Sequence, residues 1–130
     1  MLFEIDLHSG VAIYRQIMEQ IRRGVITGEL GVGEQLESVR ELAGRLKVNP
    51  MTVSKAYSML EAEGLVERRR GVGLFVVKIR QGQKEKTKRE MLESALKKAA
   101  VTAVQLDVPE KETREQFLKI YREYNSRKRR

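Results

Sequence analysis

The sequence of 130 residues contains no cysteine and no tryptophan, and it has one histidine and two prolines. Without cysteine the chain forms no disulfide and offers no thiolate to a zinc or iron–sulfur centre. No apolar run approaches the ~18 residues of a membrane-spanning helix. The first residues also lack the basic and apolar regions of a signal peptide. We therefore expect a cytoplasmic protein with no membrane partner, no metal site and no bound cofactor.

The sequence also lacks the residue arrangements of an enzyme. It shows no nucleophile paired with a base and no set of metal ligands, and its glycines do not have the spacing of a phosphate-binding loop. A chain of 130 residues forms one modest core, to which a small helical unit can be appended. We do not expect an enzyme.

Positive charge is what the chain has in excess. Its formal net charge is +8, which favours polyanionic partners. Residues 1–79 carry 11 basic and 10 acidic side chains, whereas residues 80–130 carry 15 and 8. The excess therefore lies mainly in the C-terminal part, where it includes the run Arg127 to Arg130. That run suits a solubilising tail as well as it suits nonspecific contact with DNA.

Three amphipathic helices are predicted in the first half of the chain. Apolar residues recur with helical spacing over residues 11–27. Ser38 and Glu41 form a capping box that predicts the start of a second helix. Asn49 and Pro50 are residue types that favour the first positions of a helix, and they predict a third. The second and third helices are separated by only a few residues.

A β-hairpin is predicted directly after the third helix. Residues 65–68 and 74–79 are short and rich in β-prone side chains, and the tip between them is formed by the run of arginines Arg68 to Arg70 and two spaced glycines. The order of three helices and a hairpin is that of a winged helix-turn-helix. We expect a mainly α fold with a small β-hairpin (α+β), with a DNA-binding domain over residues 1–79.

The C-terminal part predicts a different unit. Residues 80–86 are polar and are interpreted as a linker, and Thr87 with Glu90 offers a capping box for the next helix. Residues 87–130 are expected to form a helical hairpin, interrupted at Pro109 and ending in the basic tail. Two such helices cannot bury their apolar sides alone, so a second copy of the chain is the simplest partner. The expected dimerisation residues are Leu92, Leu96, Ala99, Ala103, Leu106, Phe117, Tyr121 and Tyr124.

The third helix is predicted to read the major groove, which admits one α-helix. Its positions outside the apolar stripe can reach base edges and phosphates, the start of the second helix can meet the backbone, and the basic hairpin tip can bond phosphates or enter a minor groove. The candidate DNA-binding residues are Ser38, Arg40, Met51, Thr52, Ser54, Lys55, Ser58, Arg68, Arg69, Arg70, Gly71 and Gly73.

These residues resemble a known family. The span from Ile13 to Val77, including IYRQIMEQIRRGVITGEL, GEQLESVRELAGRLKVNPMTVSKAYSMLEAEGLV and RRRGVGLFV, is similar to the DNA-binding domain of GntR-family regulators. The NPMTVSKAY string and the short C-terminal extension are most similar to the YtrA subfamily. Two departures stand out: Glu37 replaces the usual proline of the turn before the second helix, and Pro50 stands where many members carry an arginine.

The resemblance implies roles for Arg40, Met51, Thr52, Ser54 and Gly71 in binding DNA, and a C-terminal region that dimerises. It also implies repression of the protein's own operon, often one that encodes a transporter. We expect a homodimer on an inverted-repeat operator in double-stranded DNA, associated with the nucleoid when bound; a small-molecule effector of unknown identity remains open. The alternative is a winged-helix module that binds proteins.

Overall fold

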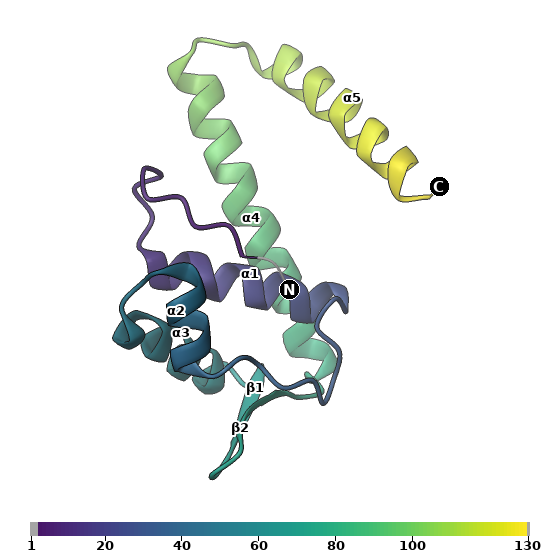
Figure 1. The fold of residues 1–130 in the computed structure, drawn as a ribbon. Coiled ribbons are helices and arrows are strands. Elements are labelled where there is room, and N and C mark those ends of the chain that lie inside the picture. Colours follow the sequence, from purple (N-terminus) through teal and green to yellow (C-terminus); the bar gives the residue numbers. More distant parts are fainter. Residues whose placement is uncertain (1–2, 130) are drawn as a thin grey trace. The chain divides into compact units, whose positions relative to one another are not determined.

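A computed structural model describes residues 3–129 and divides them into two compact units (Figure 1). The first unit ends at Lys84 and the second begins at Glu85. The first contains three helices and a hairpin, and the second contains most of one long helix and all of another. The expected mainly α architecture with a small β-hairpin is confirmed. No helix of residues 3–129 combines the length and apolar character of a membrane span.

Three helices form the core of the first unit: α1 (Ile13–Thr27), α2 (Val39–Leu46) and α3 (Pro50–Ala62). α3 lies in the middle and packs on both α1 and α2 (Figure 1). All three were predicted, and α1 begins two residues later than the sequence pattern indicates. The buried side chains come from these helices, from the connection after α1 and from the hairpin with the residue before it; the largest fully buried ones are Ile17, Ile21, Leu42, Leu60, Leu65, Val53 and Val76.

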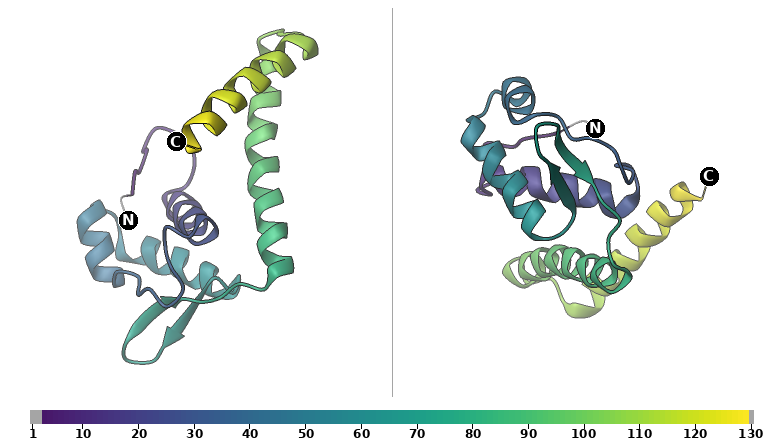
Figure 2. Two further views of the ribbon diagram at one scale, coloured as in Figure 1. Left: turned by 90° about the vertical axis from the view of Figure 1, so that its right-hand side faces the viewer. Right: turned by 90° about the horizontal axis from the view of Figure 1, so that it is seen from below.

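The hairpin consists of β1 (Val66–Arg69) and β2 (Gly73–Val76), which pair antiparallel and extend away from the helices (Figure 2). The predicted second strand is shorter than expected, because it ends at Val76. The connection between α1 and α2 adds a third extended segment beside β2, with Leu36 N donating to Leu74 O at 2.9 Å and Val76 N donating to Glu34 O at 2.9 Å. These bonds attach β2 to the helical core.

Residues 3–6 form an extended segment that is held on α1 by two glutamines one helical turn apart. Gln20 donates to the carbonyl of Glu4 at 2.7 Å and accepts from the same residue's N–H at 2.9 Å. Gln16 makes the equivalent pair of bonds with the backbone of Asp6, both at 2.8 Å. The side-chain amides thus satisfy backbone groups that a neighbouring strand satisfies in a sheet.

The predicted linker over residues 80–86 is wrong from residue 81 onward, because α4 spans Gln81–Gln105. The segment is rich in glutamine, lysine and glutamate, which are good helix formers, so its polarity does not break the helix. Thr87 therefore lies inside α4, where it is buried, and it does not cap the helix start.

The last helix, α5, spans Glu110–Lys128 and follows Pro109, as predicted. A short turn joins it to α4, and Asp107 in this turn adopts a left-handed backbone conformation with φ of 55°. α4 and α5 make almost no contact with each other within the described chain, so they do not form a packed hairpin. Their apolar side chains stay exposed.

Candidate nucleic-acid interface

The exposed side of α3 carries most of the side chains predicted to read bases. Val53, Ala56, Tyr57 and Leu60 are buried on the opposite side, and Asn49 caps the helix by accepting from Met51 N at 2.8 Å. Met51 is 78% exposed, and Ser54, Lys55 and Ser58 are also exposed. Thr52 is half-buried at the edge of this surface. A polar, exposed helix side of this kind can enter a major groove.

The start of α2 is fixed by the predicted capping box. Ser38 Oγ accepts from Glu41 N at 3.1 Å, and Ser38 N donates to the Glu41 carboxylate at 3.4 Å. The Ser38 hydroxyl still has its hydrogen to donate to a phosphate. Arg40 is exposed in the first turn of α2, and within residues 3–129 it has no carboxylate partner in an ion pair. Its charge is therefore available to an external anion.

Glu37, in the turn before α2, is held both by its side chain and by its backbone carbonyl. Its carboxylate accepts two hydrogen bonds from Arg45, from Nη2 at 2.6 Å and from Nε at 3.2 Å. Its backbone carbonyl accepts from the Tyr57 hydroxyl at 2.8 Å. The ion pair spans α2 and the hydrogen bond reaches α3, so the turn is connected to both helices.

The three arginines of the hairpin differ in their surroundings. Arg68 Nε lies 3.5 Å from the Glu61 carboxylate of α3. Arg69 lies with its guanidinium carbon 4.2 Å from the centre of the Phe75 ring and its Nε 3.7 Å from the Glu67 carboxylate. Arg70, in the turn, is exposed and has no ion pair among the described residues. Of the three arginines, Arg70 is therefore the one whose charge is not offset by a nearby carboxylate within residues 3–129.

The hairpin tip is shaped by two glycines and one glutamine. Gly71 has φ of 77°, in the left-handed region. Gly73 has φ of 140°, and a Cβ atom there would lie 2.8 Å from the side-chain nitrogen of Gln35. This nitrogen donates to Val72 O at 2.9 Å. Gln35 therefore holds the tip from outside the hairpin, a role that the sequence pattern did not reveal.

A second missed feature lies where α1 begins. Lys55 Nζ lies 4.1 Å from the centre of the Tyr14 ring, and Arg15 Nε donates to the Tyr14 hydroxyl at 3.1 Å. Tyr14 is one of the apolar positions that recur with helical spacing over residues 11–27, and its ring is half-buried. The only sign of this feature in the sequence is that Arg15 directly follows Tyr14 at the start of the predicted helix. The sequence could not show that Lys55 comes to the same ring.

The predicted dimerisation residues lie in the second unit and are largely unburied. Leu92, Leu96 and Leu106 are 57%, 43% and 68% exposed, and Ala99 is exposed whereas Ala103 is half-buried. On α5 the rings of Phe117 and Tyr121 lie 6.0 Å apart, and Phe117, Tyr121 and Tyr124 are 48%, 57% and 62% exposed.

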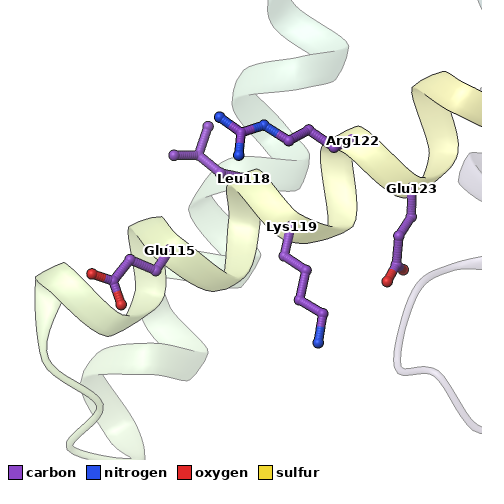
Figure 3. Close-up of a pocket in the computed structure, with 5 residues that line it drawn as sticks. All are labelled: Glu115, Leu118, Lys119, Arg122 and Glu123. Atoms are coloured by element: carbon purple, nitrogen blue, oxygen red, sulfur yellow. The ribbon is translucent and has the colours of Figure 1, made fainter.

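A surface hollow on α5 does not resemble a site for a small molecule. Its lining residues all belong to this one helix and carry charges of both signs (Figure 3). Leu118 and Arg122 lie together on one side, and Lys119 and Glu123 point to the other (Figure 3). Small-molecule sites are concave and bury most of the ligand, which the face of one helix cannot do, so this surface offers no candidate effector site.

A groove-sized helix with an exposed polar side, preceded by a short capped helix and followed by a basic hairpin, defines a winged helix-turn-helix DNA-binding protein. The family model for the gntR family of bacterial regulatory proteins matches residues 13–76. The repressor YtrA of Bacillus subtilis is 37% identical over 102 residues, which cover 78% of each chain. The chain belongs to the GntR family of bacterial transcriptional regulators, whose members are regulators and not enzymes.

Solved structures agree with this assignment along most of the chain. A transcriptional antiterminator from Listeria monocytogenes is 34% identical, with a TM-score of 0.72 over 96% of this chain and 90% of that one. YtrA from Sulfolobus acidocaldarius, a GntR-family transcription factor, is 36% identical, with a TM-score of 0.59 over 78% of this chain and 99% of that one. The resemblance to the YtrA subfamily is confirmed.

Proposed function

We propose that this protein is a sequence-specific repressor that binds an inverted-repeat operator, in its own operon, as a homodimer. The observation that carries the proposal is the exposed side of α3, with Met51, Ser54, Lys55 and Ser58 facing away from the core. Arg40 and Arg70, exposed and free of ion pairs within residues 3–129, supply charge beside it. Repression is supported by the name of the Bacillus subtilis relative, a transcriptional repressor.

Each predicted residue has a proposed role at the DNA. Ser54 and Thr52 bond base edges, Met51 touches a thymine methyl group, and Lys55 and Ser58 bond phosphates or bases. The backbone contacts come from the start of α2 and from the hairpin, where the glycines allow close approach. The residues proposed for these backbone contacts are Ser38, Arg40, Arg68, Arg69, Arg70, Gly71 and Gly73.

Dimerisation is supported by the unburied apolar side chains of the second unit. Besides Val101, nine large apolar side chains of α4, α5 and their connection are exposed, each by 43–75%. At roughly 100 Å² each, they total about 900 Å², comparable to the ~800 Å² that each partner buries in a standard interface. Because α4 and α5 hardly touch within one chain, a second copy can cover both.

The DNA-binding part of the proposal is tested by selecting sites from random duplex DNA at near-physiological salt. We expect one inverted-repeat motif with half-sites about 10 bp apart, or a multiple of this spacing, because two copies of α3 must enter successive major grooves. Recovery of no motif above the nonspecific background would favour the protein-binding alternative. Repression is then tested with a reporter under the recovered motif; unchanged or raised expression would contradict it.

The dimer is tested with a matched pair of substitutions on α4. Leu96→Glu places a charge among the predicted dimerisation residues and should weaken dimerisation by at least about tenfold, because burying an unpaired charge is costly. Val101→Glu adds the same charge five residues later, about 140° around the helix, at a side chain that is 54% exposed. Sedimentation at micromolar concentration should show monomers for Leu96→Glu and dimers for Val101→Glu and the unmodified chain. A monomeric unmodified chain, or an unaffected Leu96→Glu variant, contradicts the proposal.

A further inference from the structure

Two cations gather around one aromatic ring at the edge of the candidate DNA surface. Lys55 comes from α3, whereas Tyr14 and Arg15 come from the first turn of α1. Lys55 Nζ lies 4.1 Å from the ring centre, and Arg15 bonds the hydroxyl of the same ring. We call these three residues the Tyr14 cluster. Arg15 uses one of its five N–H groups for this bond, so the others remain to bind an acceptor.

The Tyr14 cluster has no acidic counterpart. Five other arginines of the first unit form ion pairs with carboxylates, and these are Arg22, Arg23, Arg45, Arg68 and Arg69. Arg15 and Lys55 have no carboxylate partner of this kind in the described part of the chain. Two exposed cations that converge without a carboxylate favour binding of an external anion.

The positive charge around Tyr14 affects the pKa of its hydroxyl. The hydrogen bond from Arg15 lowers the pKa of the Tyr14 hydroxyl, and the charges of Arg15 and Lys55 act in the same direction. The electron-rich face of the ring attracts the Lys55 ammonium, so it keeps both cations in place although they repel each other. Tyr14 is half-buried, which gives the cluster a fixed support.

The Tyr14 cluster lies at one edge of the exposed side of α3, and the hairpin lies at the other. Lys55 and Glu61 are six residues apart on α3, which places them about 120° apart around the helix. Glu61 pairs with Arg68 of the hairpin, so the hairpin and the Tyr14 cluster flank different edges of the exposed side of α3. A helix in the major groove, which is about 12 Å wide, has a phosphate backbone on each side.

We propose that the Tyr14 cluster binds a phosphate of the DNA backbone at the edge of the major groove away from the hairpin. This inference rests on the proposed function, and it extends the DNA surface to α1. Arg15 donates hydrogen bonds to the phosphate oxygens and Lys55 adds a point charge. Tyr14 is a positioning residue, because it orients Arg15 through its hydroxyl and Lys55 through its ring.

The test compares Arg15→Gln with Arg23→Gln. Both remove one positive charge from α1, but Arg23 pairs with Glu19 on the same helix at 3.0 Å. Binding is measured by fluorescence anisotropy between about 50 and 200 mM salt. The probes are the inverted-repeat duplex recovered by selection and a scrambled duplex of the same composition. Arg15→Gln should weaken binding to both duplexes by up to about fivefold. It should also reduce the slope of log binding constant against log salt concentration by about 1 per subunit.

Two further variants separate the cluster from the proposed function. Lys55→Gln should bind the scrambled duplex as weakly as Arg15→Gln does. Tyr14→Phe should bind DNA with a salt dependence between those of Arg15→Gln and the unmodified chain. Its melting temperature should not change. If Arg15→Gln matches Arg23→Gln while Arg70→Gln weakens binding, the cluster does not bind phosphate although the protein binds DNA. If the unmodified chain binds neither duplex, the proposed function and the inference both fall.

Discussion

Replacing Tyr57 by phenylalanine removes one hydroxyl group from the core of the first unit. Tyr57 is 2% exposed, and its hydroxyl donates to the Glu37 carbonyl at 2.8 Å. The loss of this hydrogen bond should destabilise the fold by about 1 kcal/mol at neutral pH. Chemical denaturation at pH 7 measures this cost.

The same substitution should have the opposite effect in alkaline solution. Burial raises the pKa of Tyr57 well above its ordinary value, and the Glu37 carboxylate adds to the shift. The folded chain therefore keeps the proton that the unfolded chain releases near pH 10. The contribution of Tyr57 to stability is complete below this pH and is lost as the pH rises toward the folded-state pKa, at about 1.4 kcal/mol per pH unit. Phenylalanine has no proton to lose.

The stabilities of the two proteins should thus cross between about pH 10 and pH 11, above which Tyr57→Phe is the more stable. Titration of other groups affects both proteins and cancels in the comparison. Ser38→Ala is the control: it should also cost about 1 kcal/mol by removing a helix cap, but it removes no group that titrates near pH 10, so its deficit should stay constant with pH. A Tyr57→Phe deficit that stays constant from neutral pH to pH 11 would refute the reasoning from burial.

Three other substitutions test the parts that position the DNA surface. Ser38→Ala removes the capping box of α2 and should cost about 1 kcal/mol, seen as a fall of about 4–8 °C in melting temperature; an unchanged melting temperature would contradict this. Gln35→Ala releases the Val72 carbonyl, so hydrogen exchange should accelerate in the hairpin tip while the helices stay protected; equal rates would show that Gln35 does not hold the tip. Arg70→Gln should flatten the salt dependence of DNA binding more than Arg68→Gln, because Arg68 already has a carboxylate partner; equal effects would contradict this ranking.

The features that could be predicted from the sequence depend on neighbouring residues. The capping box of Ser38 and Glu41 and the start of α3 at Asn49 and Pro50 are formed by atoms within one helical turn, so the sequence pattern contains all that determines them. The apolar spacing likewise identified the buried side of each helix in the first unit. The exposed side of α3, and with it most of the candidate base-reading residues, followed by elimination.

The features that could not be predicted depend on distant residues. The extended segment beside β2 forms because residues 34 and 36 meet 74 and 76, which are about 40 positions away. The pairing of Arg68 with Glu61 and the approach of Lys55 to Tyr14 likewise arise only once α3 is packed. The error at residues 80–86 has a different cause: polarity was interpreted as a break, although the same side chains favour a helix.

The two glutamines that hold the N-terminal segment have a consequence for how this sequence can diverge. All four bonds go to main-chain atoms of Glu4 and Asp6, and every residue type except proline offers these atoms. Mutational drift at positions 4 and 6 therefore leaves the attachment intact, whereas the amides of Gln16 and Gln20 have no equivalent among apolar or charged side chains. Selection for the attachment of the N-terminal segment therefore acts on Gln16 and Gln20 of α1 and not on the segment itself.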